Sequence, residues 1–265
     1  MQLTINHKTH YTYDLPVHYA LQQIRLRPLT TPQQTVLDWS ISVVGGKIEN
    51  TYLDHLGNST DLISVDADAT QVVITATGHI ETHDNLGILG HIHGNAPLWF
   101  YKSQTPLTAP SAAIRKLAKS GFAGDTPLLS LHGLSAAVLA ALPYGFGETH
   151  AVTSANDALT GSFGVCQDHA HIFISAARSL GFAARYVSGY LMMNDRIDQD
   201  AGHAWAEVFL DDLGWVGFDV SNGISPDERY VRTAIGLDAN DAAPVKGMRL
   251  GNANESLIVS LQVQQ

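Results

Sequence analysis

Apolar and polar residues alternate from Gln2 to about Glu81, a segment rich in Thr, Val, Ile and Tyr. The alternation is clear in Leu3-Thr4-Ile5 and again from Leu37 to Val43. A period of two places successive side chains on opposite faces of a strand, as in a sheet with one buried face. Turn signals at Gly45-Gly46 and Gly57-Asn58 separate the later strands. The pattern predicts an antiparallel β domain of the meander or sandwich type.

The spacing of apolar residues becomes helical after a mixed stretch of Gly, His, Asn and Pro between Leu86 and Thr108. We place a domain boundary near Thr105, which gives a β-rich domain over residues 1–105 and a second domain over residues 106–265. In the second domain, helices are predicted from Ser111 to Lys119 and from Leu128 to Leu142.

A loop that ends at Gly164 leads into a further predicted helix, which Gly181 terminates. Three strands are predicted to follow: Ala183 to Leu191, His203 to Leu210 and Trp215 to Val220. Helices and strands that occupy separate stretches of one chain are typical of the α+β class.

The charge and the apolar content limit the classes of partner. The formal net charge is −10 and the sequence contains no run of Lys or Arg, which argues against nucleic acid as a partner. The N-terminus lacks the pattern of a signal peptide, and the most apolar window, Leu128 to Leu142, is shorter than the roughly 20 residues of a membrane span. We therefore expect a cytoplasmic protein without a membrane segment.

Cys166 is the single cysteine of the chain, so the sequence allows no internal disulfide and no site with several thiolates. It stands where the helix after Gly164 is predicted to begin. The unpaired N–H groups and the positive dipole end of a helix favour a thiolate there, and Gly161 and Gly164 would let a substrate approach the backbone. Cys166 is therefore the candidate nucleophile, with backbone N–H groups as the oxyanion site.

A thiol nucleophile needs a general base, and His203 begins the second strand predicted after the helix. Asp219 lies on the strand that follows. If the connection after Leu210 closes a hairpin, His203 faces Asp219 and Trp205 faces Gly217. Opposed residues have Cβ atoms roughly 5 Å apart, close enough for a carboxylate to hold the imidazole tautomer.

Four segments of the second domain follow one another in a distinctive order. They are Gly164-Val165-Cys166-Gln167-Asp168, Arg185-Tyr186-Val187-Ser188-Gly189-Tyr190, His203-Ala204-Trp205-Ala206-Glu207-Val208 and Gly214-Trp215-Val216-Gly217-Phe218-Asp219-Val220-Ser221-Asn222-Gly223. In this order they resemble the core of the transglutaminase-like family over roughly residues 155 to 225. The β-rich first part resembles the N-terminal domain often attached to bacterial members.

The resemblance implies a β-sandwich-like domain followed by a papain-like catalytic core, in which the nucleophile helix packs on an antiparallel sheet. It implies that Cys166 is the nucleophile, His203 the base and Asp219 the acid that orients His203, with a protein or peptide as substrate. The family includes peptidases, amidases and cross-linking transferases, so water and a primary amine stay open as acceptors. We favour hydrolysis, because the sequence shows no second, amine-selecting pocket. A non-catalytic binding module is the remaining alternative, and the intact triad argues against it.

Five residues are expected to support the nucleophile or to line a substrate groove: Gly164, Gln167, Tyr190, Trp205 and Trp215. The aromatic members could equally fill the core. Asp168 is expected to cap the nucleophile helix, and His169 and His171 to have structural or supporting roles.

No cofactor and no metal is predicted. His79 and His83, and likewise His91 and His93, have spacings that a metal could use, but the sequence fixes no third ligand. Asp195, Asp198 and Asp200 form an acidic stretch that lacks the pattern of a calcium-binding loop, and nothing identifies the calcium sites of the animal transglutaminases.

Overall fold

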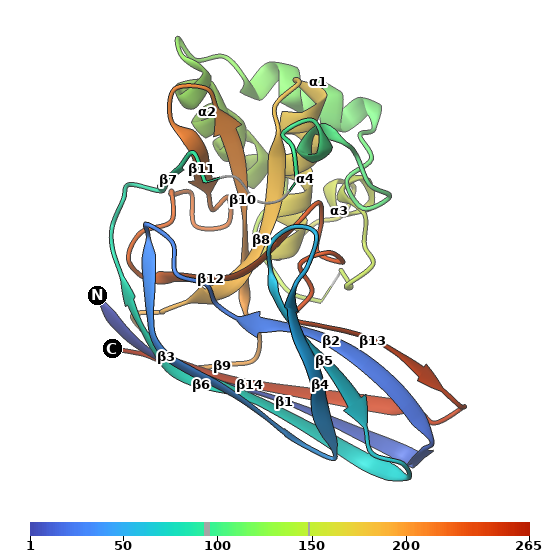
Figure 1. Ribbon diagram of the computed structural model, residues 1–265. Helices are drawn as coiled ribbons and strands as arrows, with labels where there is room; N and C mark the ends of the chain where they lie inside the picture. The colour runs from blue at the N-terminus through green and yellow to red at the C-terminus, as the bar shows by residue number, and fades with distance from the viewer. Residues whose placement is uncertain (93–95, 148) are drawn as a thin grey trace.

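The structure is a computed structural model that describes residues 1–92, 96–147 and 149–265. Its lower half in Figure 1 consists of two β-sheets, with strand orders β3-β6-β1-β14-β9 and β13-β2-β5-β4. The first sheet contains β1 (Gln2–Val17), β3 (Gln34–Val44), β6 (Ala69–Thr82), β9 (Asp198–Gln199) and β14 (Glu255–Gln264). The second contains β2 (Tyr19–Arg27), β4 (Gly46–Leu53), β5 (Ser59–Val65) and β13 (Val245–Leu250).

The two sheets pack face to face around one apolar core. Buried side chains from both sheets form it, among them Tyr11, Ile24, Ile63 and Ile74. Along β1 most alternate residues are buried, as the alternating sequence predicts. The prediction of a β-sandwich-like N-terminal part is confirmed.

The upper half contains a third sheet, of strand order β12-β8-β10-β11-β7, with helices packed against it (Figure 1). Its strands are β7 (Ile88–Gly90), β8 (Ala184–Leu191), β10 (His203–Leu210), β11 (Gly214–Phe218) and β12 (Tyr230–Gly236). The helices are α1 (Ala112–Gly121), α2 (Pro127–Ala141), α3 (Ala155–Leu159) and α4 (Cys166–Ser179), with a short 3₁₀ turn η1 (Phe100–Lys102). No helix of the described residues is long and apolar enough to cross a membrane.

Local sequence signals explain where the helices begin and end. Ser111 accepts a hydrogen bond from the Ile114 N–H at the start of α1, and Thr126 does the same for Leu129 at the start of α2. After α4, Gly181 has a φ of +93°, a conformation that glycine adopts without steric cost. Helix α4 packs on β8 and β10 through a buried cluster, as expected for a nucleophile helix on an antiparallel sheet.

Each of the predicted ranges, 1–105 and 106–265, contributes strands to both the sandwich and the third sheet. The predicted boundary therefore does not separate these two parts. Strand β14 pairs with β1, and β13 pairs with β2, although both follow the catalytic segments in the chain. Strand β7 pairs with β11, although it precedes residue 105. The predicted domain boundary lies where the spacing of apolar residues changes. That spacing predicts whether a segment is a strand or a helix, but it does not predict which strand pairs with which.

Two side-chain amides of the sandwich hold the edge strand β12. Gln34 donates from Nε2 to the carbonyl of Arg232 at 2.9 Å and accepts from the Arg232 N–H at 2.8 Å. Asn58 makes the same pair of bonds with Ile235, both at 2.8 Å. The sandwich therefore satisfies backbone groups that an edge strand otherwise leaves unpaired, and it fixes the position of β12.

Candidate active site

Cys166 is the first residue of α4 and is partly exposed. Asp168, three residues after the N-cap Val165, accepts a hydrogen bond from the Val165 N–H at 2.8 Å, and Thr149 donates to the same carboxylate oxygen at 2.7 Å. The predicted capping role of Asp168 is confirmed. The N–H groups of the first turn, including that of Cys166, have no partner within the helix, and they are suited to receive an oxyanion.

Gly164 lies where the chain has no room for a side chain. It forms a β-bridge with Tyr144, and a Cβ at this position would stand 2.5 Å from Cδ2 of Leu142. Gly164 therefore supports the loop before the nucleophile through close packing, in agreement with the supporting role expected of it.

His203 and Asp219 form a buried pair, in which His203 Nε2 lies 2.6 Å from Asp219 Oδ2. Burial alone would lower the pKa of His203, but its hydrogen bonds to Asp219 and Cys166 and the charges of both residues outweigh burial and raise the pKa to about 10. Because Nε2 is engaged by Asp219, Nδ1 is the ring nitrogen left for Cys166. The structure thus brings all three predicted triad residues together.

Asp219 is fully buried and accepts from more donors than the sequence predicts. The Tyr230 hydroxyl and the Asn222 side-chain amide each donate to Oδ2 at 2.7 Å, and the Asn222 N–H donates to Oδ1 at 3.2 Å. Burial alone would raise the pKa of Asp219, but the hydrogen bonds and the charge of His203 lower it below its usual value. The carboxylate is therefore held charged.

The predicted hairpin register is wrong by two residues. Strands β10 and β11 pair Ala206 with Phe218 and Glu207 with Gly217, so Trp205 and not His203 is in line with Asp219. The contact survives because β11 ends at Phe218 and Asp219 begins the next turn, where it bridges to Ile224. The Asp219 carboxylate therefore contacts His203 from just past the last residue pair of β10 and β11.

Two of the aromatic residues expected in a groove belong to the interior. Tyr190 is buried against the sandwich, and its hydroxyl lies 2.9 Å from Nδ1 of His7. Trp215 is buried under the guanidinium of Arg185, whose Cζ lies 3.8 Å from the ring centroid. For these two residues the groove is wrong and the core alternative holds. Every residue of a strand that is buried on both faces is apolar in pattern, so the sequence does not separate the two roles.

Trp205 lies beside the triad but is itself buried. Its ring stacks on His203 with centroids 6.3 Å apart and meets the ring of Tyr230 edge to face at 5.5 Å. It therefore restricts the position of the imidazole from one side, which is support for the triad and not an exposed groove wall.

Gln167 lies at a cavity of about 310 Å³ next to the nucleophile, and its side chain donates to the Ala151 carbonyl at 3.2 Å. The other walls come from β8, from residues 239–240 and 242–244 before β13, and from the first two residues of β13. Gln167 therefore lies in the wall of this cavity, and its contact with a substrate stays a prediction.

His169 and His171 are both buried on α4. His169 bonds to the Leu142 carbonyl at 2.7 Å and to the Ser221 hydroxyl at 2.8 Å. His171 Nε2 accepts from the Ala239 N–H at 3.1 Å, and burial lowers the pKa of His171 to about 4. Both contact neighbouring loops, in agreement with structural roles.

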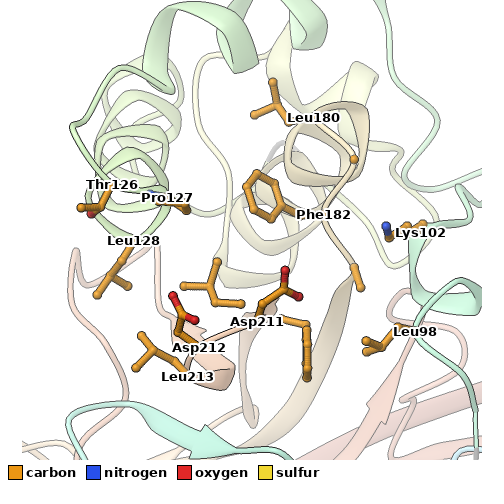
Figure 2. Close-up of a pocket in the computed structure, with 14 residues that line it drawn as sticks. Leu98, Lys102, Thr126, Pro127, Leu128, Leu180, Phe182, Asp211, Asp212 and Leu213 are labelled. Carbon is orange, nitrogen blue, oxygen red and sulfur yellow. The ribbon is translucent and has the colours of Figure 1, made fainter.

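A larger cavity, of about 570 Å³, lies at the opposite end of the sheet (Figure 2). Figure 2 shows it between the start of α2, the chain that follows α4 and the turn that joins β10 to β11. Strand β10 separates its Leu210 end from His203 by roughly 23 Å at the rise of a strand. This cavity therefore takes no part in the arrangement around Cys166.

Among the described residues, no group of three His, Cys, Asp or Glu side chains is arranged to hold a metal ion. His93, one of the histidines with a spacing that a metal could use, lies outside the described residues. His79 Nδ1 pairs with Asp38 at 2.9 Å on the surface.

Two family models match the chain. The bacterial transglutaminase-like N-terminal region matches residues 3–81, and the transglutaminase-like superfamily matches residues 125–220, the span that holds Cys166, His203 and Asp219. Residues 125–220 form a core of the transglutaminase-like superfamily. The match of the core supports a cysteine-dependent enzyme.

Two of the similar proteins are mycobacterial. An uncharacterized protein of Mycobacterium leprae is 26% identical and covers 99% of this chain and 98% of its own length. An uncharacterized protein of Mycobacterium tuberculosis is 36% identical over 57% of this chain, which spans about half (52%) of that protein. A crystal structure from Cytophaga hutchinsonii, described as that of a "putative cysteine protease", has a TM-score of 0.78 and 24% identity and covers 100% of this chain and 91% of its own. It establishes that the two proteins share a fold.

Proposed function

We propose that this protein is a cysteine peptidase or amidase that cleaves amide bonds through a thioester at Cys166. The observation that carries the proposal is the buried His203–Asp219 pair, 2.6 Å apart, next to Cys166, which is partly exposed at the start of a helix and whose charge helps to raise the pKa of His203. A structural cysteine needs neither a base nor a carboxylate behind that base. The substrate is a protein or a peptide.

In the first step, the Cys166 thiolate adds to the carbonyl carbon of the scissile amide. The N–H groups at the start of α4 stabilise the negative oxygen. The raised pKa of His203 keeps its imidazole protonated at neutral pH, so His203 can give that proton to the leaving nitrogen as the C–N bond breaks. An amine leaves and a thioester remains on Cys166.

In the second step, water attacks the thioester carbonyl. His203, now neutral, takes the proton of the water, and the carboxylic acid leaves as the C–S bond breaks. Asp219 holds the ring of His203 through Nε2 in both steps, which keeps Nδ1 directed at the thiol. The resting pair of thiolate and imidazolium is restored.

The test has two stages. The first measures the reactivity of the Cys166 thiol and needs no substrate. We expect Cys166 to react with iodoacetamide at pH 6, well below the free-thiol pKa of about 8.5, and His203→Ala to abolish that reaction. Intact-protein mass spectrometry measures the rate. Ordinary thiol behaviour in both proteins would refute the enzyme and leave a binding module.

The second stage distinguishes the two acceptors. A diverse peptide pool is incubated with the protein and a primary amine, and Cys166→Ala serves as the control. Cleavage that depends on Cys166 without amine incorporation supports the peptidase or amidase, whereas amine-sized mass gains on glutamine would make the protein a transamidase.

A further inference from the structure

Three aromatic side chains gather on the surface beside the nucleophile, and we call them the aromatic platform: Tyr144, Phe146 and Phe163. Their exposed fractions are 44%, 77% and 45%. Aromatic side chains of this size bury large apolar areas when they are covered, so leaving three of them in water is unfavourable for a surface without a binding role.

Backbone contacts make the platform one unit. The Gly145 N–H donates to the Gly164 carbonyl at 2.9 Å, and the Gly164 N–H donates to the Pro143 carbonyl at 3.1 Å. A Cβ on Gly145 would stand 2.8 Å from Cβ of Phe163, so the two segments touch. The rings of Tyr144 and Phe146 meet edge to face with centroids 5.4 Å apart. The platform is therefore held by the loop that also holds Cys166.

The platform is continuous with the candidate active site. Phe163 and Cys166 are separated by two residues, and Tyr144 forms its bridge with Gly164, one of those two. The ring of Tyr144 also lies 6.1 Å from that of His169 on the nucleophile helix. The charge of Cys166 contributes to raising the pKa of Tyr144, after burial as the larger cause, which is consistent with this proximity.

We infer that the aromatic platform binds a large apolar side chain of the peptide whose scissile amide lies at Cys166. The inference rests on the proposed function and names its substrate class: peptides with an aromatic or large aliphatic residue near the bond that is cleaved. A peptide chain seated at Cys166 must pass over the adjacent loop. An apolar side chain placed there removes water from its own surface and from the rings together.

The experiment measures protection of Cys166 and needs no turnover. The initial rate of alkylation by iodoacetamide is followed with increasing amounts of two pentapeptide amides, identical except for Phe or Gly at the central position. We expect the Phe peptide to halve the rate at about a tenfold lower concentration than the Gly peptide. In the double variant Phe146→Ala, Phe163→Ala, the rate with each peptide is compared with the rate of that variant without peptide. The two peptides should then protect Cys166 at the same concentration.

Two further proteins complete the test. Phe146→Ala alone removes the most exposed ring and should lose part of the difference, which keeps the test open if the double variant fails to fold. Trp99→Ala removes a ring that is 69% exposed and outside the platform, and it should keep the full difference. Equal protection by the two peptides in the natural protein, or a difference that persists without both Phe rings, would overturn the inference. Failure of the proposed function would show separately, as ordinary thiol reactivity without peptide.

Discussion

Two carboxylates are buried in or beside the third sheet, and both are compensated by several donors. Glu207 of β10 accepts from the guanidinium of Arg185 at 2.6 Å and also from Arg232. Asp219 accepts from His203, Tyr230 and Asn222. A buried carboxylate without such donors would be strongly destabilising, so both networks meet the same physical requirement.

The two networks differ in what their partners can do. The partners of Glu207 are guanidiniums, which keep their charge at any physiological pH. The guanidinium of Arg185 also packs on the ring of Trp215. The main partner of Asp219 is an imidazole, which can lose its proton and which reaches a partly exposed thiol. Burial and ion pairing are therefore no sign of chemistry by themselves. A titratable partner with access to a nucleophile is what separates the two.

The largest effect is expected at Asp219. Asp219→Asn keeps an oxygen that can accept from Tyr230, but an amide neither carries charge nor holds the same imidazole tautomer. We expect turnover of cleaved peptides to fall by roughly 10³- to 10⁴-fold. Peptide cleavage followed by mass spectrometry measures the effect. A loss smaller than tenfold would mean that Asp219 does not orient His203.

The corresponding change in the other network should affect stability and leave the thiol alone. Glu207→Gln leaves Arg185 and Arg232 charged, buried and without a carboxylate, at a cost of about 3–5 kcal/mol in the free energy of unfolding. Urea denaturation measures this loss. The alkylation rate of Cys166 at pH 6 in the folded variant should stay within about twofold of the natural protein. A large drop in that rate at normal stability would show that the two networks are coupled.

Above pH 6.5 the pH dependence of stability should come from only one of the networks, because the lowered pKa of Glu207 acts at acid pH. His203 has a pKa raised from 6.5 to about 10 in the folded protein, so its contribution is fully present below pH 6.5 and is lost as the pH rises through about 10. We expect the free energy of unfolding to fall by roughly 2–4 kcal/mol across this window. His203→Gln should lack this part of the slope, whereas Glu207→Gln should retain it. Equal slopes in the natural protein and His203→Gln would contradict a raised pKa.

Segments with strong local patterns could be predicted from the sequence. The alternation before Glu81 predicts the sandwich strands, and the loop ending at Gly164 predicts the start of α4 at Cys166. Cys166 and His203 can be found because each stands at the start of a predicted element, and Asp219 because the predicted hairpin places it near His203. The register of β10 and β11 could not be found in this way, since a shift by two keeps every side chain on its face.

Contacts between distant segments carried no local signal. Gln34 and Asn58 read as ordinary turn or strand residues, yet both bind the backbone of β12. Tyr230 lies at the start of β12, a strand that the sequence analysis did not predict, and its donation to Asp219 depends on the fold of the whole sheet. The residues that support the triad from distant segments could therefore not be predicted from the spacing of residues in the sequence.

Tyr230 gives the finest test of the difference between the networks. Tyr230→Phe removes one of the donors to Asp219 and keeps the ring against Trp205, so His203 should be held slightly less well. A hydrogen bond to a charged group is worth about 1.5–3 kcal/mol, and with the other donors remaining we expect only a loss of roughly threefold to tenfold in peptide turnover. Tyr190→Phe is the matched control, because that hydroxyl bonds to His7 and not to Asp219. Its removal should lower stability without slowing turnover, and an equal loss of turnover in both variants would indicate a general effect of sheet packing.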